Sequence, residues 1–262
     1  MRRNKITMCS RFLLLRQHYD ELLNRLGIAP GPAVESRFEI APGTPIAAIR
    51  QTALPSAQSA ESHAFQRRAD SLRWGFVPAW AKQVEGRPLI NARADTVAVK
   101  PTFRDAFRLR RCVVPASGFY EWQTVGRTKK PWLFQRRDQA PFAFAGVWET
   151  WHGVDNTAIE SCAILTTEPN ATMQEIHDRM PVMLTPEQCE TWLTPDADAA
   201  ALAPLLRPSP SEQLSAVPGV TRSELRSAAA STALADVFAS WIPGSGNSDP
   251  ARAKDPFAPW FT

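Results

Sequence analysis

The chain has 262 residues, of which 44% are hydrophobic and 21% are charged. This composition is typical of a folded globular protein and excludes a fully disordered chain, and no apolar run approaches the roughly 20 residues that a membrane-spanning helix needs. The net charge of +4 is uneven, because residues 1–99 carry +6, residues 100–137 carry +8 and residues 138–262 carry −10. This positive first half predicts a surface for a polyanion; the alternative is a solvated helix face followed by a lysine-rich turn.

The first half of the chain predicts two helices among short strands. Leucines at helical spacing predict a helix over residues 16–26, which Gly27 ends. A second helix is predicted over residues 103–111, with Thr102 as its N-cap. Short apolar segments bounded by proline or glycine predict strands at residues 37–41, 46–51 and 72–77.

The second half predicts a run of antiparallel strands and one well-marked helix. The strands are expected at residues 112–114, 119–123, 132–135, 142–148 and 162–167. Thr185 and Gln188 have the spacing of a capping box, with Pro186 at the first helical position, and predict a helix that ends near Leu193. Many strands with few helices predict an α+β fold. Residues 243–262 have the composition of a disordered tail.

The cysteine pattern bears on the cellular compartment. Four cysteines have irregular spacing and form no CxxC pair: Cys9, Cys112, Cys162 and Cys189. We therefore expect reduced thiols in a cytoplasmic protein, with no metal and no cofactor. The basic residues at the N-terminus precede only four apolar residues, 12–15, which is too short a stretch for a signal peptide.

Cys9 follows Met8, a credible second initiator. If translation began at Met8 and this residue were removed, Cys9 would carry a free α-amine, with a pKa of roughly 7.7–8.0, beside its thiol. Such a 1,2-aminothiol condenses with an aldehyde to an imine, and the thiol then closes a five-membered thiazolidine ring. The alternative is that Cys9 is a small buried hydrophobic residue.

Two further residues could move protons. Glu121 lies among aromatic residues on a predicted strand, where desolvation would raise its pKa and make it a proton donor near neutral pH; the alternative is that strand alternation points it to solvent. His177 could transfer protons at physiological pH, although a single histidine is more often structural.

Asn91 and Arg93 alternate with apolar residues, so both side chains could share one face of a strand. An amide such as Asn91 could hold an amine or an oxyanion by hydrogen bonds, and Arg93 could hold a phosphate. The alternative is an ordinary polar sheet face.

Seven segments, in order along the chain, together resemble the SOS response-associated peptidase (SRAP) family. They are MCSRF (8–12), IAPGT (40–44), RWGFVPAW (73–80), LINAR (89–93), FRDAF (103–107), RCVVPASGFYEW (111–122) and IHDRMP (176–181). The resemblance extends from residue 8 to about residue 193. It implies a single α+β domain over residues 8–226, with mostly antiparallel strands around a barrel-like core and a few flanking helices. Residues 1–7 would be a leader that is removed or not translated, and residues 227–262 a disordered tail rich in Ala, Pro and Ser.

The resemblance implies a protein that binds single-stranded DNA containing abasic sites and crosslinks to it covalently. Cys9, once N-terminal, would supply the amine and the thiol, and Asn91 would position them. Glu121 would act as general acid and base, and His177 would move protons during opening of the sugar ring and release of the crosslink, a lyase-like step. Self-cleavage between Met8 and Cys9, a thiol peptidase activity, would expose the cysteine.

The resemblance also implies a DNA surface. Arg11, Arg93 and Arg179 would contact phosphates, and Pro42 and Trp80 would wedge or stack against displaced bases, in keeping with the basic first half of the chain. No membrane partner is implied, and we expect a monomer that associates with the nucleoid.

The sequence departs from the family pattern at three places. Ser10 stands where glycine is usual, Glu39 stands where asparagine is usual, and the C-terminal family signature is not recognisable, with residues 217–226 as a diverged remnant. Two rival functions remain open: a cysteine peptidase that cleaves other proteins, and a non-catalytic binder of single-stranded DNA.

Overall fold

The computed structural model describes residues 9–29, 34–53, 65–84 and 86–219, and the strands there form two sheets. One sheet has the order β13 (Leu214–Pro218), β8 (Thr128–Arg136), β7 (Gly118–Val125), β1 (Arg11–Leu14) and β2 (Arg37–Ile40). The other has the order β11 (Met180–Pro181), β10 (Ala158–Thr167), β4 (Phe65–Trp74), β3 (Pro45–Ala53), β6 (Arg111–Ala116), β9 (Phe142–His152) and β12 (Met183–Leu184), and β5 (Asn91–Arg93) pairs with β10.

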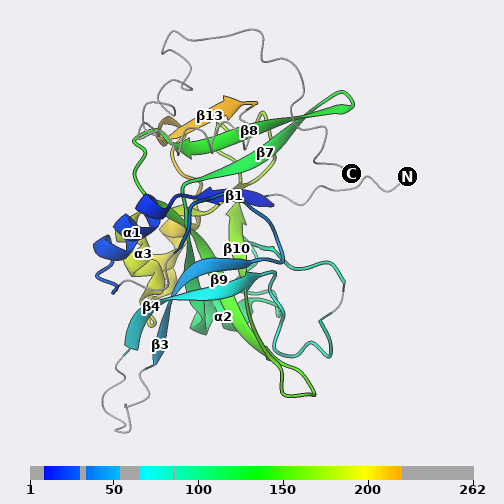
Figure 1. Cartoon of the computed structure of the whole chain (residues 1–262), viewed down its shortest axis with the longest axis vertical. Coiled ribbons are helices and arrows are strands. Elements are labelled where there is room, and N and C mark those ends of the chain that lie inside the picture. Colours follow the sequence, from blue (N-terminus) through cyan, green and yellow to red (C-terminus); the bar gives the residue numbers. More distant parts are fainter. Residues whose placement is uncertain (1–8, 30–33, 54–64, 85, 220–262) are drawn as a thin grey trace.

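The second sheet closes on itself. Strand β10 pairs with β4 on one side and with β9 on the other, so β10, β4, β3, β6 and β9 form a closed five-stranded barrel. The pairings are antiparallel except those of β10 with β4 and β5. The expected α+β fold, with mostly antiparallel strands around a barrel-like core, is confirmed (Figure 1).

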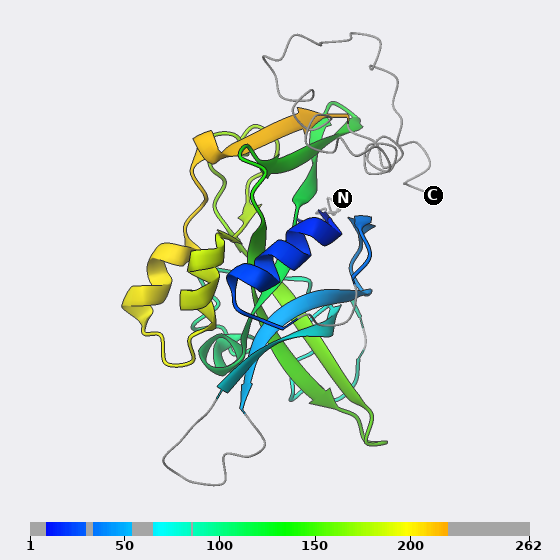
Figure 2. The ribbon, with the colours of Figure 1, turned by 60° about the vertical axis from the view of Figure 1, so that its left-hand side comes forward.

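A few short helices flank the strands. They are α1 (Arg16–Arg25), α2 (Arg104–Leu109), α3 (Pro186–Leu193) and α4 (Ala199–Leu202), followed by the 3-10 turns η1 (Ala203–Leu206) and η2 (Ser211–Gln213). The predicted capping box is present, because the Thr185 hydroxyl accepts the Gln188 N–H and the Gln188 side chain accepts the Thr185 N–H. Figure 2 shows α1, in blue, in front of the barrel and α3 and α4, in yellow, to one side of it.

Two sequence-based boundaries are wrong. The predicted helix over residues 103–111 forms only as α2, with Phe103 rather than Thr102 at its N-cap. It ends before Arg111 because that buried side chain starts β6 and donates to the carbonyl oxygens of Trp192 and Phe107. The strand predicted at residues 72–77 is the end of β4, which stops at Trp74 because Gly75 adopts a φ of +144°.

An aromatic cluster joins the two sheets. The Phe12 ring of β1 lies 5.2 Å from the Trp74 ring of β4 and 5.6 Å from the Phe144 ring of β9, both edge-on. All three side chains are buried. Edge-on aromatic pairs add to the free energy gained from burial, so this cluster anchors β1 against the barrel.

The corner between β6 and β7 fixes the register of β1. The Ser117 N–H donates to the Leu13 carbonyl at 2.8 Å, and the Leu15 N–H donates to the Ser117 hydroxyl at 2.9 Å. At Gly118, a Cβ atom would lie 2.9 Å from the Phe134 carbonyl oxygen, so glycine allows β8 to approach this closely. With this register, Arg11 lies opposite Tyr120 of β7.

The expected leader (residues 1–7) and tail (residues 227–262) lie outside the described residues, and the domain boundaries at 8 and 226 remain predictions. Among the described helices, none is long and apolar enough to cross a membrane.

Candidate functional site

Cys9 and Glu121 meet where the chain enters β1. Because Arg11 pairs with Tyr120, the residues just before β1 lie beside Glu121 of β7. The Cys9 backbone N–H donates a hydrogen bond to Glu121 Oε1. Cys9 is fully buried and Glu121 is 1% exposed, so the solvent-facing alternative for Glu121 is wrong.

Burial changes the proton affinity of both groups. Desolvation raises the pKa of Glu121 to about 8, with the nearby Asp178 carboxylate acting in the same direction. The hydrogen bond from the Cys9 N–H opposes this rise but does not cancel it. Glu121 therefore holds a proton at neutral pH and is able to give it up and take it back.

The Cys9 thiol is held in its neutral form. Burial raises its pKa well above the usual value, and the nearby Glu121 carboxyl adds to the effect. The residue also has a φ of +44°, a left-handed conformation that is rare for a side chain other than glycine. Such a conformation persists only where the surrounding structure holds it.

The segment that carries His177 lies next to β7. Gln123 of β7 donates from its side-chain amide to the Glu175 carbonyl at 3.1 Å. His177 is largely buried, and its Nδ1 atom lies 2.9 Å from Asp178 Oδ1 without forming a hydrogen bond. Burial lowers the pKa of His177, and the Asp178 carboxylate opposes this shift, so the imidazole is neutral at pH 7 and available to accept a proton.

Three more of the predicted residues lie near the C-terminal end of β10. Strand β5 runs parallel to β10, with Asn91 opposite Ile164 and Arg93 opposite Thr166. Arg179, just before β11, donates to the backbone and side-chain oxygens of Thr166. Asn91 is half-buried, Arg93 is exposed, and the two therefore sit on a face that reaches solvent.

The three predicted phosphate-binding arginines do not form one open cluster. Arg11 lies on the other sheet, where its Nε is 3.1 Å from Glu39 Oε1. Arg93 pairs with Asp95, its Nε donating to Oδ1 at 3.0 Å. Asp95 is not among the site residues predicted from the sequence, although its position two residues after Arg93 is a usable signal for such a pair.

Pro42 and Trp80 lie on two segments of the chain that are joined by a backbone hydrogen bond. Pro42 is in the turn after β2, and the next residue, Gly43, donates its N–H to the Trp74 carbonyl at 2.7 Å. Trp80 follows β4 and its side chain is 70% exposed. An exposed tryptophan is suited to stacking on a base.

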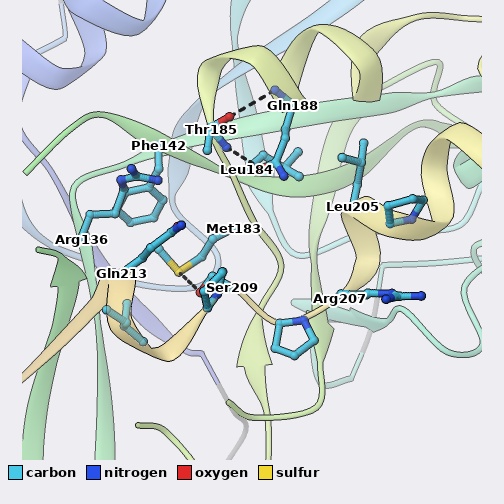
Figure 3. Close-up of a pocket in the computed structure, with 14 residues that line it drawn as sticks. Arg136, Phe142, Met183, Leu184, Thr185, Gln188, Leu205, Arg207, Ser209 and Gln213 are labelled. Carbon is cyan, nitrogen blue, oxygen red and sulfur yellow. Dashed lines mark hydrogen bonds between the residues drawn. The ribbon is translucent and has the colours of Figure 1, made fainter. Parts of the chain in front are cut away.

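Two pockets have neither Cys9 nor Glu121 in their linings. A pocket of about 360 Å³ includes Arg93, Arg179 and Arg207 in its lining. A second pocket, of about 330 Å³, lies at α3 and η2, where Met183 and Ser209 form part of the wall (Figure 3). Arg207 lines both pockets, and no sequence motif indicated it as a candidate site residue. No cluster of three or more potential metal ligands occurs in the described part of the chain.

Comparison with protein families gives one match. The family model described as "SOS response associated peptidase (SRAP)" matches residues 8–222. This range contains every residue of the candidate site.

Curated relatives are similar over most of the chain. The abasic site processing protein YoqW of Bacillus subtilis is 35% identical over 215 residues, which cover 80% of this chain and 91% of that protein. The abasic site processing protein YedK of Escherichia coli is 30% identical over 191 residues, which cover 71% of this chain and 79% of that protein.

Two crystal structures have a similar fold. A protein from Bordetella bronchiseptica matches with a TM-score of 0.67 and 26% identity, covering 81% of this chain and 100% of that one. A protein from Bacteroides thetaiotaomicron matches with a TM-score of 0.62 and 27% identity, covering 74% of this chain and 82% of that one.

Proposed function

This chain belongs to the SOS response associated peptidase (SRAP) family, and from that premise we propose that it binds single-stranded DNA at abasic sites and bonds to them covalently through Cys9. Relatives named abasic site processing proteins support the substrate. The observation that carries the mechanism is the hydrogen bond from the Cys9 backbone nitrogen to the buried Glu121 carboxyl.

The reaction begins when the Met8–Cys9 peptide bond is hydrolysed, by the protein itself or after initiation at Met8. The Cys9 nitrogen is then a primary amine, still beside Glu121. It attacks the aldehyde carbon of the ring-opened abasic sugar and forms a carbinolamine, which loses water to give an imine. Glu121, which is protonated near neutral pH, donates the proton that the departing hydroxyl needs.

Ring closure completes the adduct. The Cys9 sulfur adds to the carbon of the protonated imine, whose nitrogen keeps its proton, and the thiol proton leaves for the Glu121 carboxylate. The net change is an aldehyde and an aminothiol converted to a thiazolidine and one water molecule. Because burial keeps the thiol protonated, a nearby proton acceptor is essential for this step.

The other predicted residues have supporting roles. Asn91 would orient the amine, and neutral His177 would accept protons during opening of the sugar and lyase-like release. Arg11, Arg93 and Arg179 would hold phosphates, and Pro42 and Trp80 would contact bases. The cytoplasmic, nucleoid-associated location and the monomeric state are part of this same proposal.

The direct test is crosslinking to an oligonucleotide. Purified protein is incubated with a single-stranded oligonucleotide that contains one abasic site, and the adduct is resolved on a denaturing gel. We expect Cys9→Ala to abolish the stable adduct and Cys189→Ala to retain it, because Cys189 is a buried internal cysteine of α3 without a free amine.

Two results would contradict the proposal. Crosslinking by Cys9→Ala at the wild-type rate would remove Cys9 from the mechanism. Repeated cleavage of unrelated peptides, with no adduct, would instead favour a peptidase that acts on other proteins.

A further inference from the structure

The arginines proposed to meet phosphates already face carboxylates of this chain. Arg11 pairs with Glu39, and Arg93 pairs with Asp95. Both arginines lie on the proposed DNA path, where each carboxylate occupies a position that suits a phosphate oxygen. A DNA strand whose phosphates contact these arginines has to displace the two carboxylates, which repel it.

Asp95 is shared between two arginines. Its Oδ2 atom bonds to Arg93 Nη2 and lies 4.0 Å from Arg179 Nη1. Arg93 holds the pKa of Asp95 below its usual value, so this carboxylate stays ionised. Burial, followed by the nearby Arg93 cation, lowers the pKa of Arg179. Among the described residues, Asp95 is the carboxylate that forms ion pairs with both cations, and it occupies the place that a phosphate would take.

The carboxylates are not needed to orient at least two of the arginines. Arg179 is already fixed by its bonds to the Thr166 backbone and hydroxyl oxygens. Arg11 also donates from Nη1 to the Ser10 carbonyl at 2.7 Å. A purely positioning role would therefore be redundant for Glu39 toward Arg11 and for Asp95 toward Arg179.

There is room for a phosphate beside Asp95. The 360 Å³ pocket has Arg93, Arg179 and Arg207 on its walls, together with the carboxylates of Asp95, Glu168 and Asp178. Arg207 is exposed, and no hydrogen bond or ion pair involves it among the described residues. Figure 3 shows its side chain directed away from Met183 and Ser209, so it remains available to an anion.

We propose that Asp95 and Glu39 are internal counter-ions that compete with DNA phosphates for Arg93, Arg179 and Arg11. This inference rests on the proposed function and concerns its specificity. The competition weakens binding to intact single strands, which form no covalent bond and leave again. At an abasic site the thiazolidine holds the strand, so weak reversible binding is sufficient there.

The test measures reversible binding to an intact single-stranded oligonucleotide at several salt concentrations. The Arg93–Asp95 pair is exposed and the Arg11–Glu39 pair is partly buried. Exposed pairs contribute little to stability, so the gain should be modest: Asp95→Asn and Glu39→Gln should each bind about two- to fivefold more tightly than wild type at low salt. The dependence of log Kd on log salt should steepen by up to about 0.7 for each arginine freed for a phosphate.

Asp105→Asn is the matched control. Asp105 pairs with Arg104 on α2, with side-chain exposures of 53% and 56%, compared with 52% and 59% for Asp95 and Arg93. The Asp105→Asn variant removes one negative charge, as Asp95→Asn does, but at a position away from the proposed DNA path. We therefore expect its binding to stay within error of wild type.

The outcomes separate the two proposals. If wild-type protein neither binds single strands nor crosslinks to abasic ones, the proposed function fails. If wild type binds and crosslinks but Asp95→Asn and Glu39→Gln bind equally or more weakly, the counter-ion inference alone is overturned. An equal gain for Asp105→Asn would also overturn it, because net charge would then explain the effect.

Discussion

The Cys9 nitrogen and the Glu121 carboxyl, to which we assign the reaction, lie in a region closed to water. Cys9 and Glu121 are buried together, and the carboxyl has a pKa of about 8 because burial disfavours its charged form. A group with this pKa is mostly protonated at pH 7, with a minor ionised fraction. It can therefore both donate and accept a proton within one reaction cycle.

This buried acid predicts a pH dependence of stability. The native pKa of about 8 lies above the ordinary value of 4.5, so the folded chain retains a proton that the unfolded chain has released. This contribution to stability is fully present below about pH 4.5 and is lost as pH rises to about 8. The slope is at most about 1.4 kcal/mol per pH unit.

Glu121→Gln should remove that slope. Urea unfolding at pH 5.5 and pH 8.5 should show a smaller loss of stability at high pH for the variant than for wild type. The variant should also crosslink more slowly while it retains salt-sensitive DNA binding. Identical pH profiles, or equal losses of binding and crosslinking, would show that Glu121 is not a buried proton carrier.

At the residue scale, the sequence indicates Glu121 as a candidate proton donor but does not determine whether its side chain is buried or exposed. Alternation along a strand allows a glutamate to face either water or the core. The choice depends on β1 and β8, which lie on both sides of β7. The Arg11–Glu39 pair likewise depends on the register between β1 and β2, which local sequence does not encode.

At the scale of elements, the corner at Ser117 connects folding to the site. Its hydrogen bonds to Leu13 and Leu15 hold β1 against β7. The same pairing carries Cys9 to Glu121, two residues before β1 begins. A change at this corner should therefore affect chemistry as well as stability.

Ser117→Ala tests this connection. It leaves the buried Leu15 N–H without its acceptor, which should cost about 1–3 kcal/mol of unfolding free energy, and it should slow crosslinking under conditions where the variant is folded. Thr185→Ala is the control, because losing the α3 N-cap should cost about 1 kcal/mol and leave the rate unchanged. Equal crosslinking rates for the two variants would contradict a positioning role for Ser117.

The elements that the sequence predicted well have local causes. The α3 capping box needs only Thr185, Pro186 and Gln188 in order. The boundary of α2 has a distant cause, because Arg111 is drawn into β6 by carbonyl groups of Trp192 and Thr194. Such long-range contacts could not be predicted from spacing along the chain.

At the scale of the whole molecule, counting charges overstated the basic surface. Arg50 belongs to the positive first half, yet it is buried beneath Trp148 and bonded to Asp70 and Glu160. Arg111 is also buried, and it binds backbone carbonyls instead. Neither of these two cations is therefore available to a polyanion.

The measurement that tests the account most directly is the intact mass of the adduct formed between the full chain and an abasic single strand. We predict that every adduct contains a protein that begins at Cys9, with a total mass equal to protein plus DNA minus one water molecule. An adduct whose protein part still carries Met8 would contradict the account, because an amide nitrogen at Cys9 cannot close a thiazolidine ring.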